Sequence, residues 1–424
     1  MTSQPANIRR FGFAGQRERL LTDGAQDYGL NSLERRVTAV LAGVYGVRML
    51  GLFLLLPVLA LYAADLPGAT PLLIGLAVGA YGITQATLQV PFGILSDRIG
   101  RKPVIIFGLL IFIAGSVIAA RSDTMMVLIA GRALQGAGAI SAAVTAWLAD
   151  HTRVEYRTRS MAVVGVTIGG SFMLSLMLGP VLANLWGVAG LFWLAAILGV
   201  VAMLLVGFGV PAAPRQLAGT GNLADGLADR RLRLLYGGVF VLHLALTGLF
   251  VALPLMLREE LGFAVDQHWK LYLTSLLLSL LGTVPMIVLA ERHRRTGGAG
   301  VLTAAVLLVA GGQLVLYTGL GGLTGVGVGL ILFFAGFNFL EARMPALLSI
   351  LAAAENRGAA LGIYATSQFL GAFAGGVLAG VVMGSGGTGM VYAVGAGLLA
   401  AWGLLGKILN IRLFEANSGV LKIG

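Results

Sequence analysis

The sequence predicts an all-α polytopic membrane protein made of two related six-helix bundles, and three observations support this fold class. The 424 residues are 58% hydrophobic and 11% charged, with a mean hydropathy of +0.90, whereas soluble domains carry about 25% charged residues. Twelve segments each hold the roughly 20 apolar residues that a helix needs to cross a hydrocarbon core. One hairpin sequence also occurs twice, as VPFGILSDRIGRK at 90–102 and VPMIVLAERHRRT at 284–296.

The apolar segments give the order of the elements. We expect membrane-spanning helices at 37–64, 72–96, 103–120, 125–149, 160–184, 188–210, 233–257, 270–290, 299–318, 322–350, 358–383 and 389–411. Pro, Gly and charged residues between 211 and 231 are typical of a loop joining two bundles. The expected organisation is an arm at 1–36, a bundle at 37–210, a linker at 211–231, a bundle at 232–412 and a tail at 413–424. Similar bundles facing a shared cavity are a transporter architecture.

The distribution of basic residues predicts the orientation. Of the 29 Lys and Arg residues, all but six lie in the arm, the even-numbered connections and the tail; the six are Arg121, Arg258 and Lys270 on the other side and Arg48, Arg132 and Arg343 within spans. The positive-inside rule then places both termini in the cytoplasm. Basic loops facing anionic lipid account for the net charge of +11. The bilayer is therefore the expected partner, and nucleic acid is not.

The sequence lacks the residues that several kinds of chemistry need. The sequence has no cysteine, which excludes disulfides and thiolate chemistry. Its four histidines are dispersed, so we expect no metal site. We find no constellation of nucleophile and base, and no nucleotide-binding motif. The sequence therefore predicts neither an enzyme nor a cofactor.

Two motifs carry a resemblance. GILSDRIGRKP at 93–103 resembles the loop between helices 2 and 3 of the major facilitator superfamily, and RALQGAG at 132–138 is similar to its helix-4 motif. RMLGLFLLLPVL at 48–59, FNFLEARMPALLS at 337–349 and GIYATSQFLGAF at 362–373 resemble the YajR-type bacterial inner-membrane transporters. Those transporters have a soluble domain after helix 12, which we do not expect in this sequence because it ends at Gly424.

The first motif predicts a conformational latch. Gly100 suits a tight reversal between two spans, and Asp97 would lie at a helix end where it could meet the positive N-terminus of a neighbour. The resemblance implies that this neighbour is helix 11, expected to begin at 356–358, and that Arg101 pairs with Asp150. Such contacts would hold the outward-open state. The latch set is Gly93, Asp97, Arg98, Gly100, Arg101, Lys102 and Asp150. The alternative is a solvated topology signal, which is how we interpret the second copy.

Charges within spans are the next candidates, because a charge at the bilayer centre costs at least about 2.5 kcal/mol. Glu341 is the preferred proton carrier, since a carboxyl in a low-dielectric cavity can load and release a proton as water access changes. The alternative is a permanent pair with Arg48, Arg132 or Arg343. Arg48 is either a cavity cation that tunes Glu341 or a buried brace between helices. Arg132, with Gln135, is expected to tether helix 4 and to take part in coupling.

Polar and aromatic side chains that interrupt apolar helices predict the cavity lining. The better candidates are Tyr45, Gln85, Gln89, Asn338, Tyr364 and Gln368, with Tyr81, His243 and Phe172 behind them. Each has an alternative role in a hydrogen bond between helices. Such a lining suits an amphipathic or apolar molecule.

GGSFMLSLMLGP at 169–180 contains Gly179 and Pro180, which resemble the kinking motif of antiporter families in the superfamily. A proline here would let the fifth helix bend. The sequence as a whole therefore predicts a monomeric secondary transporter that works by alternating access. Its predicted activity is proton-coupled efflux of a small amphipathic or apolar compound. The alternatives are a sugar or metabolite transporter, in either direction, or a lipid flippase or substrate sensor.

Overall fold

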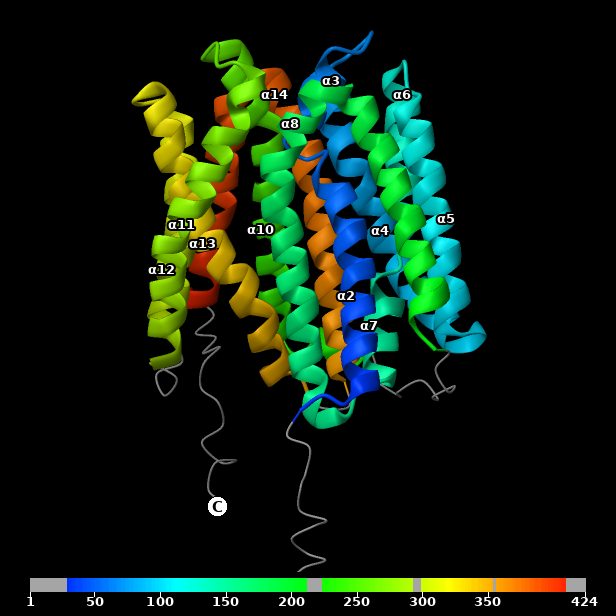
Figure 1. Cartoon of the computed structure of the whole chain (residues 1–424). Helices are drawn as coiled ribbons and strands as arrows, with labels where there is room; N and C mark the ends of the chain where they lie inside the picture. Colours follow the sequence, from blue (N-terminus) through cyan, green and yellow to red (C-terminus); the bar gives the residue numbers. More distant parts are fainter. Residues whose placement is uncertain (1–28, 212–222, 293–298, 354–355, 409–424) are drawn as a thin grey trace, which may run out of the picture.

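The computed structural model describes residues 29–211, 223–292, 299–353 and 356–408, and every regular element in these residues is helical. Figure 1 shows long helices standing side by side, as expected for a polytopic membrane protein. The first helix begins and the last helix ends at the same face of the bundle, the lower one in Figure 1. We call this the terminal face, and we call the other end the opposite face.

Two groups of helices make up the bundle. The N-half consists of α2 (Ser32–Phe53), α3 (Leu59–Ala64), α4 (Pro71–Ile99), α5 (Arg101–Ala120), α6 (Met125–Ala137), α7 (Ser141–Asp150) and α8 (Val154–Gly209). The C-half consists of α10 (Arg230–Leu255), η1 (Met256–Glu260), η2 (Val265–Gln267), α11 (His268–Arg292), α12 (Ala299–Thr318), α13 (Gly322–Leu351) and α14 (Arg357–Ile408). A short helix, α9 (Leu223–Ala228), lies between them in sequence, within the expected linker.

The predicted number of spans is confirmed. In the part of the chain that the structure describes, ten helical stretches are long and apolar enough to cross a membrane. Two of them, within α8 and α14, are each interrupted by one non-helical glycine, Gly187 with φ 68° and Gly387 with φ 74°. Positive φ is a conformation that glycine adopts without strain. Each interrupted stretch thus holds two spans, which gives twelve, and the interruptions fall at corresponding places in the two halves.

The structure corrects several predicted boundaries. The first span is not continuous, because residues 54–58 form turns between α2 and α3; Pro57 lies there and cannot donate a backbone hydrogen bond. The fourth span is interrupted at 138–140. The expected arm overlaps α2, which begins at Ser32 with Asn31 and Glu34 forming a capping box. Most of the arm, part of the linker and the tail lie outside the described residues.

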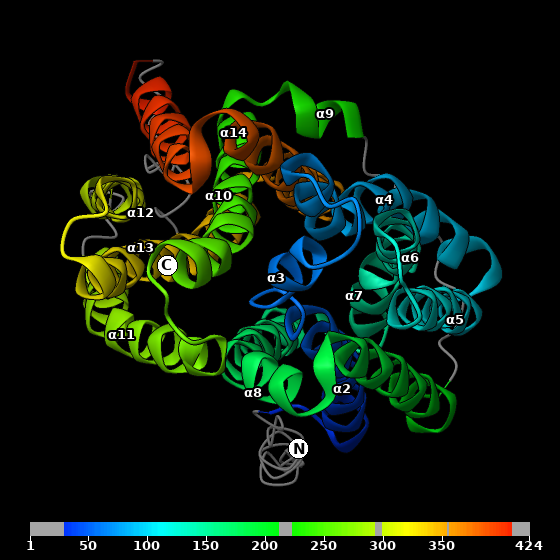
Figure 2. The same ribbon diagram turned by 90° about the horizontal axis from the view of Figure 1, so that it is seen from above.

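The N-half and C-half meet mainly along α4 with α14 and along α8 with α11 (Figure 2). The α4–α14 contact is backbone to backbone. A Cβ placed on Gly75 would lie 2.1 Å from the carbonyl oxygen of Gly376, and one on Gly380 would lie 2.5 Å from the carbonyl oxygen of Pro71. Small residues permit such close helix approach in membranes. This contact lies towards the opposite face.

Candidate functional site

The N-half contains a buried polar cluster around Arg48, which is 1% exposed. The Nη2 atom of Arg48 donates to the hydroxyl of Tyr81 at 3.0 Å, to Oε1 of Gln85 at 2.9 Å and to the carbonyl of Gly138 at 2.9 Å. Gln85 continues the chain of hydrogen bonds to Gln89 at 3.0 Å. All of these partners of Arg48 are uncharged, so the guanidinium has no carboxylate partner among the described residues.

The partner at Gly138 explains how a lone cation is tolerated in this cluster. Helix α6 ends at Ala137 and α7 begins at Ser141, so carbonyl groups at this break lack their usual helical partners. The C-terminal end of a helix also carries partial negative charge, which favours a nearby cation. Of the two roles expected for Arg48, its contacts correspond to the brace between helices; Glu341 is not among its partners. Its Nε and Nη1 atoms have no hydrogen-bond partner.

Arg132 forms a second buried cation site near the first. Its Nη1 donates to Oε1 of Gln135 at 2.7 Å and its Nε to the carbonyl of Ala77 at 3.3 Å. Gln135 in turn donates to Ser116 at 2.8 Å, so the pair joins α4, α5 and α6. The Arg132 guanidinium also lies 5.5 Å from the ring centroid of Tyr81. Tyr81 therefore contacts both buried arginines.

The C-half contains a cluster that includes Glu341, whose side chain is 37% exposed. Gln368 Nε2 donates to Glu341 Oε1 at 3.2 Å and lies 2.7 Å from Nε2 of His243. The other imidazole nitrogen, Nδ1, lies 3.1 Å from the carbonyl of Val239. His243 Nε2 is 3.8 Å from Glu341 Oε2, which has no hydrogen-bond partner. The three side chains come from α10, α13 and α14.

These clusters are connected by two consecutive residues of α14. Gln368 belongs to the Glu341 cluster, and the next residue, Phe369, contacts the Tyr81 ring edge-on with a centroid distance of 6.1 Å. Tyr81 is bonded to Arg48. The carboxylate of the C-half and the cations of the N-half are thus linked by a short path of side chains across the interface.

The remaining cavity candidates are spread over both halves. Gln85 and Gln89 are buried in the Arg48 cluster at 0% and 3% exposure, so their amides are closed off in this structure. Tyr45 is half-buried. Asn338 is also half-buried and donates to Ser279 at 3.4 Å. Tyr364 is 5% exposed and its hydroxyl has no hydrogen-bond partner.

Aromatic rings pack across the interface beside these clusters. Phe172 of α8 contacts Phe53 in its own half at 5.4 Å, and Phe250 and Phe334 in the C-half at 6.4 Å each. Edge-on arrangements at these separations are favourable. Apolar rings from both halves therefore close the space between α8, α10 and α13.

Several residues of the latch set lie together in the N-half, around Arg101. Gly100 has φ 103°, which a tight reversal between α4 and α5 requires. Arg101 forms an ion pair with Asp97 one turn before it and with Asp150 at 3.0 Å, and it donates to Ser96 at 2.7 Å. Helix α14 begins at Arg357, near the expected start of helix 11.

The other members of the latch set serve packing and anchoring. A Cβ on Gly93 would meet Ala142 at 3.4 Å, so this glycine lies where α4 packs on α7. Lys102 donates to the carbonyl of Gly207 at the end of α8. Arg98 also has an interaction partner.

The motif at 169–180, expected in the fifth helix, lies in α8 and packs against the turns at 54–58 that interrupt the first span. A Cβ on Gly179 would lie 2.5 Å from the carbonyl oxygen of Leu54 and 3.0 Å from the ring of Pro57. Pro180 lies inside α8. The two proline-containing segments therefore pack directly on each other, a contact that the sequence did not reveal.

An ion pair that sequence reasoning missed lies at the opposite face. Arg258 Nη1 is 2.9 Å from Asp65 Oδ1, and its Nη2 is 2.8 Å from Glu259 Oε1. Asp65 follows α3 in the N-half, whereas Arg258 lies in η1, a π-helical turn at the end of α10. Single π-helical turns are frequent at functional sites. The pair crosses between the halves, and only the isolated position of Arg258 on its side of the membrane could have indicated it.

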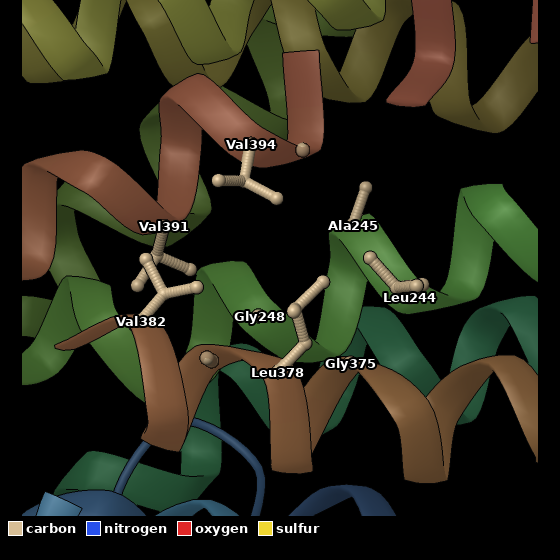
Figure 3. A pocket seen from close by; sticks show the side chains of 10 residues that line it. Leu244, Ala245, Gly248, Gly375, Leu378, Val382, Val391 and Val394 are labelled. Carbon is tan, nitrogen blue, oxygen red and sulfur yellow. The ribbon is translucent and has the colours of Figure 1, made fainter. Parts of the chain in front are cut away.

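The structure also contains a small apolar cavity between α10 and the two spans of α14 (Figure 3). Its lining is aliphatic or glycine, with Leu244, Leu378, Val391 and Val394 among the side chains shown. It offers no polar side chain that could orient a ligand. No group of three or more metal-ligating side chains occurs in the residues that were placed.

Comparison with known proteins defines the class. A family model described as Major Facilitator Superfamily matches residues 41–354. The chain belongs to the Major Facilitator Superfamily, a family of membrane transporters, and the resemblance expected from the two motifs is confirmed.

Individual members of known name are similar to this chain over most of its length. The inner membrane transport protein YajR of Escherichia coli (strain K12) is 43% identical over 382 residues, which cover 89% of this chain and 84% of YajR. The multidrug resistance protein MdtH of Aeromonas hydrophila is 27% identical over 337 residues, covering 77% of this chain and 82% of MdtH. The crystal structure of the human organic anion transporter TETRAN superposes with a TM-score of 0.63 at 22% identity, covering 88% of this chain and 99% of that chain; this similarity concerns the fold.

Proposed function

We propose that the protein exports a small amphipathic or apolar compound in exchange for protons, by alternating access of a cavity between the two halves. The observation that carries the proposal is the environment of Glu341. Its carboxylate lies within α13, away from the helix ends, and is partly accessible. Within the described parts of the chain, one of its oxygens has no hydrogen-bond partner, and the ion-pair partner given to it is a histidine.

This environment suits a group that gains and loses a proton. A carboxylate paired permanently with an arginine stays ionised, whereas one beside a neutral imidazole can be protonated when water reaches it. In the proposal Glu341 carries the proton and His243 shares it. Arg48 and Arg132 act indirectly, as braces that fix the N-half wall opposite Glu341.

Amphipathic substrates are supported by the side chains around the interface. Phe172, Phe250 and Phe334 supply apolar rings, and Tyr45, Asn338 and Gln368 supply uncharged polar groups that are half-buried. This combination favours a molecule with one apolar and one hydrogen-bonding part. Export is supported by the similarity to a multidrug resistance protein. Gly179 and Pro180 provide the bend in α8 that the cycle needs.

The proposal includes a membrane orientation and a latch. The terminal face lies in the cytoplasm of a bacterial inner membrane, and the protein works as a monomer. Asp97 exchanges its pairing with Arg101 for the N-terminus of α14 when the cytoplasmic side closes, while Arg101 keeps Asp150. The latch then stabilises the outward-open state through contacts that the inward-open state lacks.

Two steps test the proposal. Thermal unfolding of the purified protein is first measured against amphiphilic drugs, sugars, lipids and metabolites, since a bound ligand raises the melting temperature. The compound class that binds is then loaded into proteoliposomes with an imposed pH gradient. We expect uphill transport by the parent. Glu341→Gln should bind the compound with parental affinity and exchange it, but fail to accumulate it; uphill accumulation matching the parent would contradict the role of Glu341.

A further inference from the structure

We propose that Gln368 and Phe369 of α14 form a coupling relay, which transmits the protonation state of the Glu341–His243 pair to the contact between the halves. The inference rests on the proposed proton coupling and adds the residues that convert a proton into motion. Neither residue binds the proton. Both are positioning residues that act through their neighbours.

The first step concerns Gln368 and the hydrogens of the pair. Because the carbonyl of Val239 can only accept, the Nδ1 atom of His243 carries the hydrogen of the neutral ring. Nε2 is then an acceptor, and the Gln368 amide donates both to it and to Glu341 Oε1. A proton added to Nε2 of His243 places two donors face to face, whereas a proton on Glu341 can occupy Oε2 and leave Oε1 as an acceptor. Gln368 must therefore turn or withdraw when the imidazole of the pair is protonated.

The second step concerns the neighbouring residue. Consecutive residues of an α-helix point about 100° apart, and Phe369 accordingly contacts Tyr81 in the other half while Gln368 stays in its own. At the same level a Cβ on Gly82 would lie 2.5 Å from the carbonyl oxygen of Phe369. The backbones of α4 and α14 touch here, so a rotation of α14 that releases Gln368 moves the Phe369–Tyr81 contact.

The third step concerns an alternative hydrogen-bond donor for the Glu341 carboxyl. The hydroxyl of Tyr364 and Oε2 of Glu341 both lack hydrogen-bond partners. Tyr364 lies one turn before Gln368 on α14 and is 5% exposed. A rotation of α14 that withdraws Gln368 would bring this unused donor to the carboxyl. Two alternative bonding patterns provide the bistable element that a coupling mechanism requires.

The titratable neighbours of the pair are few. His243 approaches from α10 and Tyr364 lies on α14, and Arg343, which also has an interaction partner, lies two residues further along α13. Helix α12 carries no charged side chain, and those of α11 lie near its ends. A pH response that depends on Glu341 therefore reports this cluster.

The test uses the absence of cysteine from the chain. Leu33→Cys and Ile350→Cys place one spin label on each half at the terminal face, at positions that are 47% and 67% exposed. The distance distribution between the labels is measured by pulsed electron paramagnetic resonance from about pH 5 to about pH 8, the range in which histidine side chains in general change charge. In parallel, the imidazole of His243 is followed by ¹⁵N NMR, its signal being the one that His243→Gln removes.

Phe369→Leu is the decisive variant. We expect His243 to titrate as in the parent, while the pH-dependent change in the distance distribution falls at least fivefold. Phe369→Tyr keeps the ring and should restore the change. Phe333→Leu is the matched control, because Phe333 is a buried ring that packs on Phe334 and Phe337 of its own helix. Gln368→Met should reduce the distance change and also shift the titration.

The possible results separate the two proposals. A full distance change in Phe369→Leu would overturn the relay and leave proton coupling standing, provided that Glu341→Gln has lost the change. A distance change that persists in Glu341→Gln, or a parent that does not respond to pH, would overturn both. Equal losses in Phe369→Leu and Phe333→Leu would show a general effect of lost packing and would also overturn the relay.

Discussion

Arg48 shows how a single buried charge is accommodated without an opposite charge. Its three acceptors are a hydroxyl, an amide oxygen and a backbone carbonyl at a helix break. The sequence could indicate that Arg48 needs a partner, because charges within spans are costly. It could not identify that partner, because the carbonyl of Gly138 becomes available only through the interruption of the fourth span.

Arg48→Ala is therefore expected to lower stability rather than to uncouple transport. The Tyr81 hydroxyl and the Gly138 carbonyl lose their donor, whereas Gln85 Oε1 still accepts from Tyr81. At about 1 kcal/mol each or more, the free energy of unfolding should fall by about 2 kcal/mol. Thermal unfolding in detergent measures the loss, and uphill transport per folded molecule should match the parent. Parental stability with failed uphill transport would instead make Arg48 a coupling residue.

His243 illustrates a residue whose importance depends on tertiary structure. The sequence identified it only as a secondary cavity candidate, since a lone histidine in a span has no evident partner. Helix packing brings its Nε2 within 3.8 Å of Glu341, a residue 98 positions away. The local sequence pattern marks His243 and Glu341 as polar residues within spans, but it does not show that the two side chains lie close together.

At the scale of elements, the sequence predicted the helices well and their interruptions poorly. Apolar length is a property of each segment, so spans such as 72–96 and 299–318 agree closely with α4 and α12. Breaks depend on which neighbours satisfy the free backbone groups. Pro57 offered a local signal for the first break, whereas the break at 138–140 depends on Arg48 and on tight packing with α5.

The loop between α4 and α5 gives a prediction for the latch. Asp97→Asn removes the charge that pairs with Arg101 and, in our proposal, with the N-terminus of α14. We expect normal amounts of protein in the membrane and transport slowed severalfold, because the outward-open state loses stabilisation. Glu291→Gln, in the second copy, is the matched control and should have little effect. Unchanged transport in Asp97→Asn would favour the solvated topology signal.

The Asp65–Arg258 pair gives a prediction for the opposite face. An exposed ion pair contributes about 0.2–1 kcal/mol, enough to change the balance of two states up to about fivefold. Asp65→Arg should widen the distance between labels at Met126→Cys and Leu320→Cys, and adding Arg258→Asp should reverse the effect. Asp123→Arg makes the same charge change at another exposed position on that face and should leave the distance unchanged.

The whole molecule is a repeated design that has diverged. The two copies of the hairpin sequence and the matching interruptions at Gly187 and Gly387 belong to the common plan. The charges within spans are divided unequally, with Arg48 and Arg132 buried in the N-half and the carboxylate of Glu341 in the C-half. Repetition could be read from the sequence, but the division of charge across one interface required the packed structure.

The glycine contact between the halves can be tested by adding bulk. Gly376→Val would direct atoms into α4, because a Cβ there already lies 2.4 Å from the carbonyl oxygen of Gly75. We expect the halves to be forced apart at the opposite face, with transport reduced at least tenfold and the label distance on that face increased. Gly311→Val, at a site with open space around its Cα, is the control. Parental transport by Gly376→Val would exclude this contact as a pivot.

Because α4 and α14 meet through backbone atoms at Gly75, Gly376 and Gly380, no interlocking side chains have to change rotamer in this part of the contact when one helix rolls over the other. Resistance to that motion would come from weak Cα–H···O contacts, each worth about 0.5 kcal/mol, rather than from the repacking of a core. The α4–α14 contact would thus hold the halves together and still offer little resistance when one helix rotates against the other. The rate of turnover would then be set by the charged ends of the helices.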